Sequence, residues 1–132
     1  MNITYTTKLI APESLYSLYE VLGWNDFLKL NKEQLVQAMA QSWHVIYAYD
    51  QEKLVGTGRV VSDGVINAYL CGLGVDPDYR KQGIGTEISR RLAEQCHRSN
   101  LHIQFFCEED LVSYYTKMGF KVFAIGMKSE EI

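Results

Sequence analysis

Residues 75–86 read Val-Asp-Pro-Asp-Tyr-Arg-Lys-Gln-Gly-Ile-Gly-Thr, and this stretch decides the fold class of the chain. Residues 65–75, which lead into it, are mostly apolar, whereas residues 83–98 carry apolar side chains at helical spacing. An apolar run that meets glycines and then a helical pattern is typical of a strand, a tight loop and a helix start. The stretch therefore predicts a domain of the α/β class.

The loop within this stretch has the features of an anion-binding site. Gly83 and Gly85 allow close approach of the backbone to a ligand, and they stand where the first N–H groups of the helix lack partners within it. Arg80 and Lys81 add positive charge beside these groups. Because the N-terminal end of a helix dipole also attracts anions, we expect a diphosphate group to bind here.

Two better-known phosphate motifs are excluded. A P-loop needs Gly-Lys-Ser/Thr, and no lysine follows Gly85. A dinucleotide fingerprint needs a third glycine where this chain has Ile88. A glycine-capped helix that binds nothing is the alternative for an isolated Gly-x-Gly. Gly72 and Gly74 inside the preceding apolar run argue against it, because glycine in a central strand marks a bulge or a close ligand approach.

The other apolar patterns predict the elements around this loop. We expect strands at residues 2–8, 43–49, 53–61, 65–75, 102–106 and 120–127. We expect helices between Pro12 and Gly23, from Asn31 onward, over residues 83–98 and over residues 111–118. The order βααβββαβαβ describes an α/β (α+β) fold, with antiparallel hairpins early and crossover helices late. No linker, charge block or repeat interrupts the 132 residues, so residues 1–132 are expected to form a single domain.

Composition and charge restrict the class of protein. The net charge of −3 and the pI near 5.6 provide no basic footprint for nucleic acid. No apolar stretch approaches the roughly 18 residues that span a bilayer, and the N-terminal residues do not resemble a signal peptide. Cys71, Cys96 and Cys107 are widely spaced, which favours reduced thiols. The three histidines lack zinc-ligand spacing, so we expect a cytoplasmic protein without metal, membrane or nucleic-acid partners.

The chain resembles the GCN5-related N-acetyltransferase (GNAT) family. Residues 80–85 match its Arg/Gln-x-x-Gly-x-Gly/Ala signature, and residues 114–120 resemble its aromatic-Tyr-x-x-x-Gly-Phe segment. Residues 53–64 are similar to the hairpin of its compact small-molecule branch. The resemblance covers most of residues 43–123, whereas the first 40 residues agree only in element order.

The resemblance implies a mixed, mostly antiparallel six-stranded sheet flanked by about four helices. It also implies acetyl-CoA as co-substrate and the transfer of an acetyl group to a primary amine of a small molecule, peptide or protein. The pantetheine arm of acetyl-CoA is expected along Leu73, Gly74 and Val75. Its pyrophosphate is expected on Arg80, Lys81, Gln82, Gly83, Ile84, Gly85 and Thr86.

The same resemblance implies catalytic roles. A backbone N–H near Leu73 would stabilise the oxyanion, and the hydroxyl of Tyr115 would protonate the leaving thiolate. Tyr115 also lies on the apolar stripe of its own helix, where packing is the alternative role. Tyr114 takes a position that is usually aromatic and structural, so it is assigned to packing.

The chain departs from its relatives at Gly72, where many of them carry an acidic residue. The base that accepts the proton of the amine therefore stays open: a water chain or a substrate that enters neutral are both tenable. His44 is a candidate base and Cys71 a candidate acyl-carrying nucleophile. For both, a structural role is the alternative. Tyr69 and Cys71 are expected near the substrate.

Two further segments are candidates for substrate contact. Trp24 and Phe27, between the first two helices, form an aromatic wall for an amine or a plug of the core. The acidic residues 108–110 either favour a helix N-terminus or attract a cationic substrate. Two other functions stay open: an acyl-CoA sensor without efficient catalysis, and a nucleotide-binding structural subunit. The family resemblance is compatible with a monomer or a homodimer.

Overall fold

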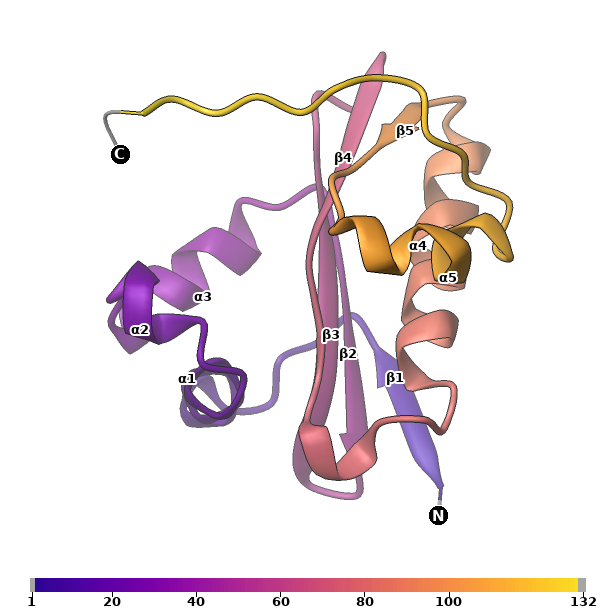
Figure 1. Cartoon of the computed structure of the whole chain (residues 1–132). Helices are drawn as coiled ribbons and strands as arrows, with labels where there is room; N and C mark the ends of the chain where they lie inside the picture. The colour runs from indigo at the N-terminus through magenta and orange to yellow at the C-terminus, as the bar shows by residue number, and fades with distance from the viewer. Residues whose placement is uncertain (1, 131–132) are drawn as a thin grey trace.

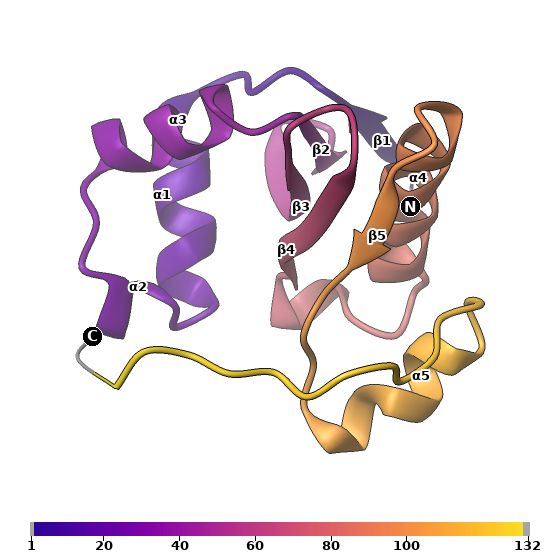
Figure 2. The ribbon, with the colours of Figure 1, turned by 90° about the horizontal axis from the view of Figure 1, so that it is seen from above.

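The computed structural model describes residues 2–130 and shows one sheet between two layers of helices (Figure 1). The elements, in order, are β1 (Ile3–Thr6), α1 (Pro12–Val21), α2 (Asn25–Leu28), α3 (Lys32–Ala40), β2 (His44–Asp50), β3 (Lys53–Ser62), β4 (Asn67–Val75), the 3-10 helix η1 (Pro77–Tyr79), α4 (Ile84–Arg98), β5 (His102–Gln104), the 3-10 helix η2 (Glu109–Leu111) and α5 (Val112–Thr116). Helices α1, α2 and α3 lie on one side of the sheet, and α4 and α5 lie on the other (Figures 1 and 2).

The sheet has the strand order β1-β2-β3-β4-β5. The first four strands are antiparallel neighbours, because short turns connect β2 to β3 and β3 to β4. Strand β5 is parallel to β4, since α4 carries the chain back across the sheet before β5 begins. The expected α/β class and mixed topology are confirmed.

Two apolar cores lie on the two faces of the sheet. The core under α4 contains the helical stripe of Ile84, Ile88, Leu92 and Cys96, all buried against the central strands. Helices α1 and α3 cover the second core, to which they contribute Leu15, Leu18, Tyr19, Leu35 and Met39. Because each face is covered by its own helices, β3 is buried along most of its length.

The helix boundaries follow the local sequence signals. Pro12 occupies the first turn of α1, and Gly23 follows its end with a φ of +77°, which favours glycine. Helix α3 begins with a capping box, in which Asn31 and Gln34 each accept a hydrogen bond from the backbone N–H of the other. Helix α4 starts immediately after Gly83, as the sequence predicts.

One sequence-based expectation is wrong. The sixth strand, expected at residues 120–127, does not form among the described residues, and the sheet has five strands. Ile125 and Met127 in this segment are 91% and 90% exposed. The segment crosses from the α5 side toward α2 instead of following a strand (Figures 1 and 2). A strand needs a free edge of matching length, and the edge strand β5 has only three residues.

The connection between the first two long helices also differs in detail from the expectation. Residues Asn25–Leu28 form the short helix α2, so residues 2–130 contain five α-helices, close to the expected number of about four. The buried Asn25 side chain explains this turn, because it donates to and accepts from the backbone of Leu30 at 2.8 and 2.9 Å. An asparagine that closes a local turn in this way is not distinguished by hydrophobic periodicity.

Candidate active site

A β-bulge interrupts β4 at the centre of the sheet. Thr57 of β3 pairs with Gly74, whereas Arg59 pairs with Cys71, so Gly72 and Leu73 together oppose one residue of β3. Gly72 has a φ of +63°, a conformation that glycine adopts without strain. The sequence predicted a bulge or a close approach at the glycines of this strand, and the bulge at Gly72 is confirmed.

The bulge also changes which residues of β4 share a face of the sheet. Strict alternation along the strand would place Leu70 and Leu73 on opposite faces. In the structure both pack against the core beneath α4, together with Val75. The extra residue reverses the alternation, so the other face of β4 is left with Cys71 and with the side-chain-free Gly74.

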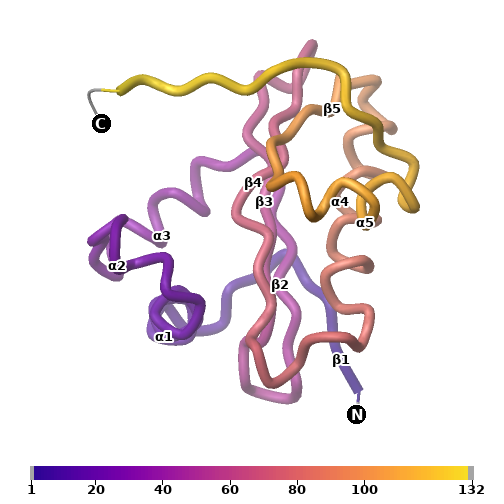
Figure 3. The backbone as a smooth tube through the Cα atoms, in the orientation of Figure 1, coloured from indigo at the N-terminus to yellow at the C-terminus, as the bar shows by residue number. Residues whose placement is uncertain are grey.

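Strands β4 and β5 separate after three residue pairs. Their ladder runs from Asn67 opposite His102 to Tyr69 opposite Gln104, and beyond it residues 70–75 of β4 have no strand partner on that edge among the described residues. The chain after β5 continues through η2 into α5 (Figure 3). Strands β4 and β5 therefore diverge beyond Tyr69, and we call the region between the unpaired edge of β4 and the chain after β5 the slot.

The free edge of β4 presents backbone groups to this slot. The N–H of Asp76 bonds to Val55 in β3, so the alternation of the strand directs the groups of Val75 toward the free edge. The Nε of Arg80 donates to the Val75 carbonyl at 3.1 Å, which shows that this carbonyl faces outward. Leu73, two residues earlier, has the same orientation along the strand.

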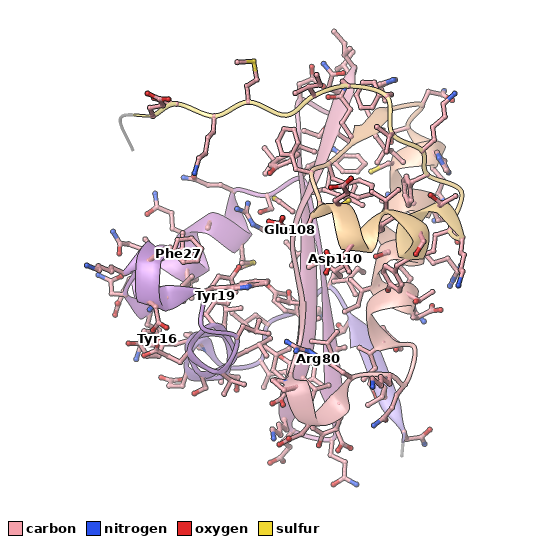
Figure 4. The ribbon with its side chains drawn as sticks, viewed as in Figure 1. Tyr16, Tyr19, Phe27, Arg80, Glu108 and Asp110 are labelled. Carbon is pink, nitrogen blue, oxygen red and sulfur yellow. The ribbon has the colours of Figure 1, made fainter. Side chains whose placement is uncertain are left out.

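Hydrogen bonds and an ion pair hold the loop after β4 in place. The carboxylate of Asp76 is buried, accepts a hydrogen bond from the N–H of Asp78 at 2.9 Å and lies 3.7 Å from Lys53 Nζ. The hydroxyl of Tyr79 donates to Asp50 at 2.6 Å. These contacts fix η1 and place Arg80 beside the end of β4 (Figure 4).

The N-terminus of α4 is open. Gly83 is its N-cap residue with a φ of +82°, and no side chain caps the helix. A Cβ atom at Gly83 would meet nothing within 4 Å, and Lys81 and Gln82 beside it are exposed. The N–H groups of this first turn therefore point to an accessible space next to the slot.

The charge of Glu87 in the first turn of α4 is compensated. Its carboxylate lies 2.7 Å from the guanidinium groups of both Arg90 and Arg91. Hydrogen bonds from Arg90 and then from Arg91 lower the pKa of Glu87 to about 2. The pair of arginines thus balances the one acidic side chain of this turn.

The two tyrosines of α5 have different surroundings. The ring of Tyr115 is half-buried against Phe105 and Phe120, with ring centroids 4.6 and 6.4 Å away. Burial is the main cause that raises the pKa of its hydroxyl. The hydroxyl of Tyr114 instead lies 3.0 Å from Thr86 Oγ1, over the start of α4. The sequence assigned Tyr114 to packing, and that assignment misses this contact with the loop.

The expected aromatic wall separates into two unlike residues. Trp24 is half-buried, stacks edge-on with Tyr19 at 5.1 Å and covers Gly74 of β4. A Cβ atom at Gly74 would lie 2.6 Å from the Trp24 ring, so the glycine makes room for this ring against β4. Trp24 is therefore better described as a plug of the core than as a wall for an amine. Phe27 is 73% exposed on α2 and lies away from β4 (Figure 4).

The side of β4 that faces α1 carries residues that the sequence analysis only partly identified. Tyr69 is partly exposed and stacks on Phe106, whereas Cys71 is half-buried. Arg59 of β3 and Tyr19 of α1 lie next to them, and neither was predicted as a site residue. The pairing of Arg59 with Cys71 could not be foreseen, because the bulge sets the register between these strands.

The comparisons with known proteins agree with this architecture. The sequence profile of the Acetyltransferase (GNAT) domain matches residues 7–130. The chain belongs to the GNAT acetyltransferase family. An uncharacterized N-acetyltransferase ycf52 of Pyropia yezoensis is 36% identical over 120 residues, which cover 87% of this chain and 67% of that protein.

Solved GNAT structures have the same fold. A GNAT-family acetyltransferase of Streptococcus pneumoniae is 29% identical, with a TM-score of 0.77 over 97% of this chain and 96% of that one. A probable acetyltransferase of Staphylococcus aureus is 18% identical, with a TM-score of 0.82 over 98% and 99% of the two chains. The second likeness concerns the fold alone.

Three further findings on this GNAT chain concern metal ligands, membrane-spanning helices and cysteines. Within residues 2–130, no group of three or more histidine, cysteine or acidic side chains is arranged to hold a metal ion. No helix in the same range is both long and apolar enough to cross a membrane. Cys71, Cys96 and Cys107 are free thiols.

Proposed function

We propose that this chain is an acetyl-CoA-dependent N-acetyltransferase that acts on a primary amine. The observation that carries the proposal is the slot between β4 and β5, which opens beside the uncapped N-terminus of α4. One end of the slot has N–H donors and the cations of Arg80 and Lys81, which suit a pyrophosphate. The free edge of β4 suits an extended chain with amide groups, such as pantetheine. Acetyl-CoA supplies the acetyl group as a reactive thioester.

The residues of the loop would hold the pyrophosphate. The N–H groups of Gln82 and Gly83 precede α4, and those of Ile84, Gly85 and Thr86 belong to its first turn. A Cβ atom at Gly83 would meet nothing within 4 Å, so the position in front of them is open. Arg80 and Lys81 would add ionic contacts from the exposed side. Tyr114 would border this end of the slot, because its hydroxyl lies 3.0 Å from Thr86 Oγ1.

The reacting carbonyl would lie at the bulge of β4. Leu73 and Val75 direct their backbone groups into the slot, so the Leu73 N–H would donate to the carbonyl oxygen of the thioester and stabilise the charge that develops on it. Tyr115, on α5, would donate a proton to the departing sulfur. Burial raises the pKa of this hydroxyl, which keeps it protonated at neutral pH. Tyr69 and Cys71 would border the amine.

The test is the release of free CoA. We expect a thiol-reactive dye to detect CoA when the protein is incubated with acetyl-CoA and a panel of primary amines, and mass spectrometry to detect the acetylated amine. CoA should raise the melting temperature, whereas ADP and NAD should not, because they lack the pantetheine arm. Stabilisation by CoA without turnover of any amine would favour an acyl-CoA sensor over an enzyme.

The pyrophosphate site has its own variant. Gly83→Val should abolish binding of acetyl-CoA, because its branched side chain would fill the open space in front of the helix N-terminus. Gly119→Val is a matched control: Gly119 has a φ of +94°, and a Cβ atom there would also meet nothing within 4 Å. Both variants strain the backbone, so calorimetric titration of acetyl-CoA separates strain from blocked binding. Unchanged affinity in Gly83→Val would contradict the proposed site.

A further inference from the structure

Arg59 is a half-buried cation that faces the helices α1 and α3. It lies in β3 directly opposite Val45 of β2 and Cys71 of β4, so its side chain shares their face of the sheet. Val45 belongs to the core beneath α1 and α3, which fixes that direction. The Nη1 of Arg59 donates to Ser42 Oγ at 3.2 Å. Its Nε is buried and has no hydrogen-bond acceptor among the described residues.

Arg59 also lacks a counter-ion within residues 2–130. The ion pairs of these residues involve Lys32, Lys53, Arg90, Arg91 and Arg98. The titratable groups that interact with Arg59 are those of Tyr19, Tyr69 and Cys71, and burial raises the pKa of all three, so they stay neutral at neutral pH. A buried guanidinium is ordinarily paired with a carboxylate, because desolvation of an unpaired charge is costly.

The position from which a side chain could pair with Arg59 is occupied by Gly72, which has none. A Cβ atom built there would lie 3.5 Å from Arg59 Nε and 3.5 Å from the Tyr19 hydroxyl, so two donors border the position from which a side chain is absent. Gly72 is also the bulge residue next to Leu73, where the acetyl group is proposed to react. An acceptor that reaches the acetyl group along this face of β4 would pass beside Arg59.

We propose that Arg59 and Tyr19 form an anion subsite, and that the acceptor is a primary amine that carries a carboxylate or a phosphate. The inference rests on the proposed acetyltransferase function. The anion of the acceptor accepts from the guanidinium of Arg59 and from the Tyr19 hydroxyl beside Gly72. Its amine is then held beside Leu73 and Cys71. The substrate supplies the counter-charge that the chain itself does not place there.

Matched pairs of acceptors test this subsite. β-Alanine is compared with β-alaninamide, and 2-aminoethyl phosphate with 2-aminoethanol, so that each pair differs in the anion. We expect kcat/KM to be about 10- to 100-fold higher for at least one anionic member, the range of a charge-assisted hydrogen bond. The pair with the larger ratio identifies the anion as carboxylate or phosphate. Ratios near one for both pairs would overturn the proposal.

Variants at Arg59 and Gly72 locate the effect. Arg59→Met should reduce the ratio of kcat/KM for the anionic acceptor to kcat/KM for its neutral counterpart toward one. Gly72→Asp should do the same, because its carboxylate would lie beside Arg59 and neutralise it. Gly72→Asn is the matched control, since both residues adopt a positive φ about equally well and only one is charged. Equal loss of the ratio in both Gly72 variants would show that bulk rather than charge acts there, and would overturn the assignment.

Binding without turnover distinguishes this proposal from the proposed function. The anionic amine is titrated into the CoA-saturated protein by calorimetry, and Arg59→Met should weaken its binding about 10- to 100-fold. Such Arg59-dependent binding without release of CoA from acetyl-CoA would refute the acetyltransferase and retain the subsite. Turnover without preference for an anion would refute the subsite and retain the acetyltransferase. Binding unaffected by Arg59→Met would also overturn the subsite.

Discussion

At the scale of single residues, the adjacent tyrosines of α5 contact different parts of the molecule. Tyr114 lies 3.0 Å from Thr86 at the start of α4, whereas Tyr115 packs among Phe105, Phe120 and Tyr114. Neighbouring positions on a helix point about 100° apart, so one can face the loop while the other faces the aromatic cluster. Their different contacts allow each to serve as the control for the other.

Tyr115→Phe should lower kcat by about 100-fold or more, the lower end of what a positioned acid contributes, with little change in the affinity for acetyl-CoA. Tyr114→Phe should instead weaken acetyl-CoA binding modestly, because it loses the hydroxyl that holds Thr86. Steady-state kinetics and calorimetric titration measure the two effects. An unchanged kcat in Tyr115→Phe would remove Tyr115 from the acid role.

The pH dependence follows from the environment of Tyr115. Burial raises its pKa above the ordinary value of 10.0, so the donor form persists at neutral and mildly alkaline pH. We expect kcat not to fall between pH 7 and about 9.5, since the proton is lost only above pH 10. A fall of kcat with a midpoint near pH 8, present in the wild type and absent in Tyr115→Phe, would contradict a buried, protonated tyrosine.

At the scale of elements, local signals succeeded where the partner of each backbone group is nearby in sequence. The capping box of Asn31 and Gln34 starts α3, and Gly83 starts α4, because both features satisfy or expose groups within a few residues. The expected strand at 120–127 failed for the opposite reason. Its apolar residues favour a strand, but the hydrogen bonds of a strand depend on a distant edge.

Asn31→Ala should destabilise the protein by about 1 kcal/mol, because the backbone N–H of Gln34 would lose its side-chain acceptor. For a domain of this size, that loss lowers the melting temperature by about 4 °C. Thermal unfolding followed by circular dichroism measures it. Glu13→Gln is the control: it breaks the exposed pair with Lys32 and should change the melting temperature little. Equal effects of the two variants would show that the capping box contributes nothing specific.

At the scale of the whole molecule, one close contact joins the helical layer of α1 and α2 to the sheet. Trp24 and Leu22 lie 2.6 and 2.7 Å from the position that a Cβ atom would take at Gly74. The contact covers the face of β4 that is directed toward α1, whereas the edge of the strand beyond Tyr69 stays unpaired. The glycine is required by tertiary packing, since nothing in the turn or strand itself requires it.

Gly74→Ala should cost about 1–3 kcal/mol, the usual penalty of overpacking. Trp24→Leu removes the ring that the new methyl group would meet, so the double variant should be more stable than the sum of the single effects predicts, by about 0.5–3 kcal/mol. Urea unfolding of the four proteins in the cycle measures this coupling. Additive effects would show that Trp24 and Gly74 do not press on each other.

The sequence alone determined the features that short stretches encode: the α/β class, the amphipathic helices, the glycine loop after β4 and the family resemblance of residues 80–85 and 114–120. It also marked Gly72 as a departure. Its consequence was decided by the tertiary structure, because the bulge sets which residue of β3 lies opposite Cys71. That register placed Arg59 beside the empty position, and the pairing of strands far apart in the chain is not written in any local pattern.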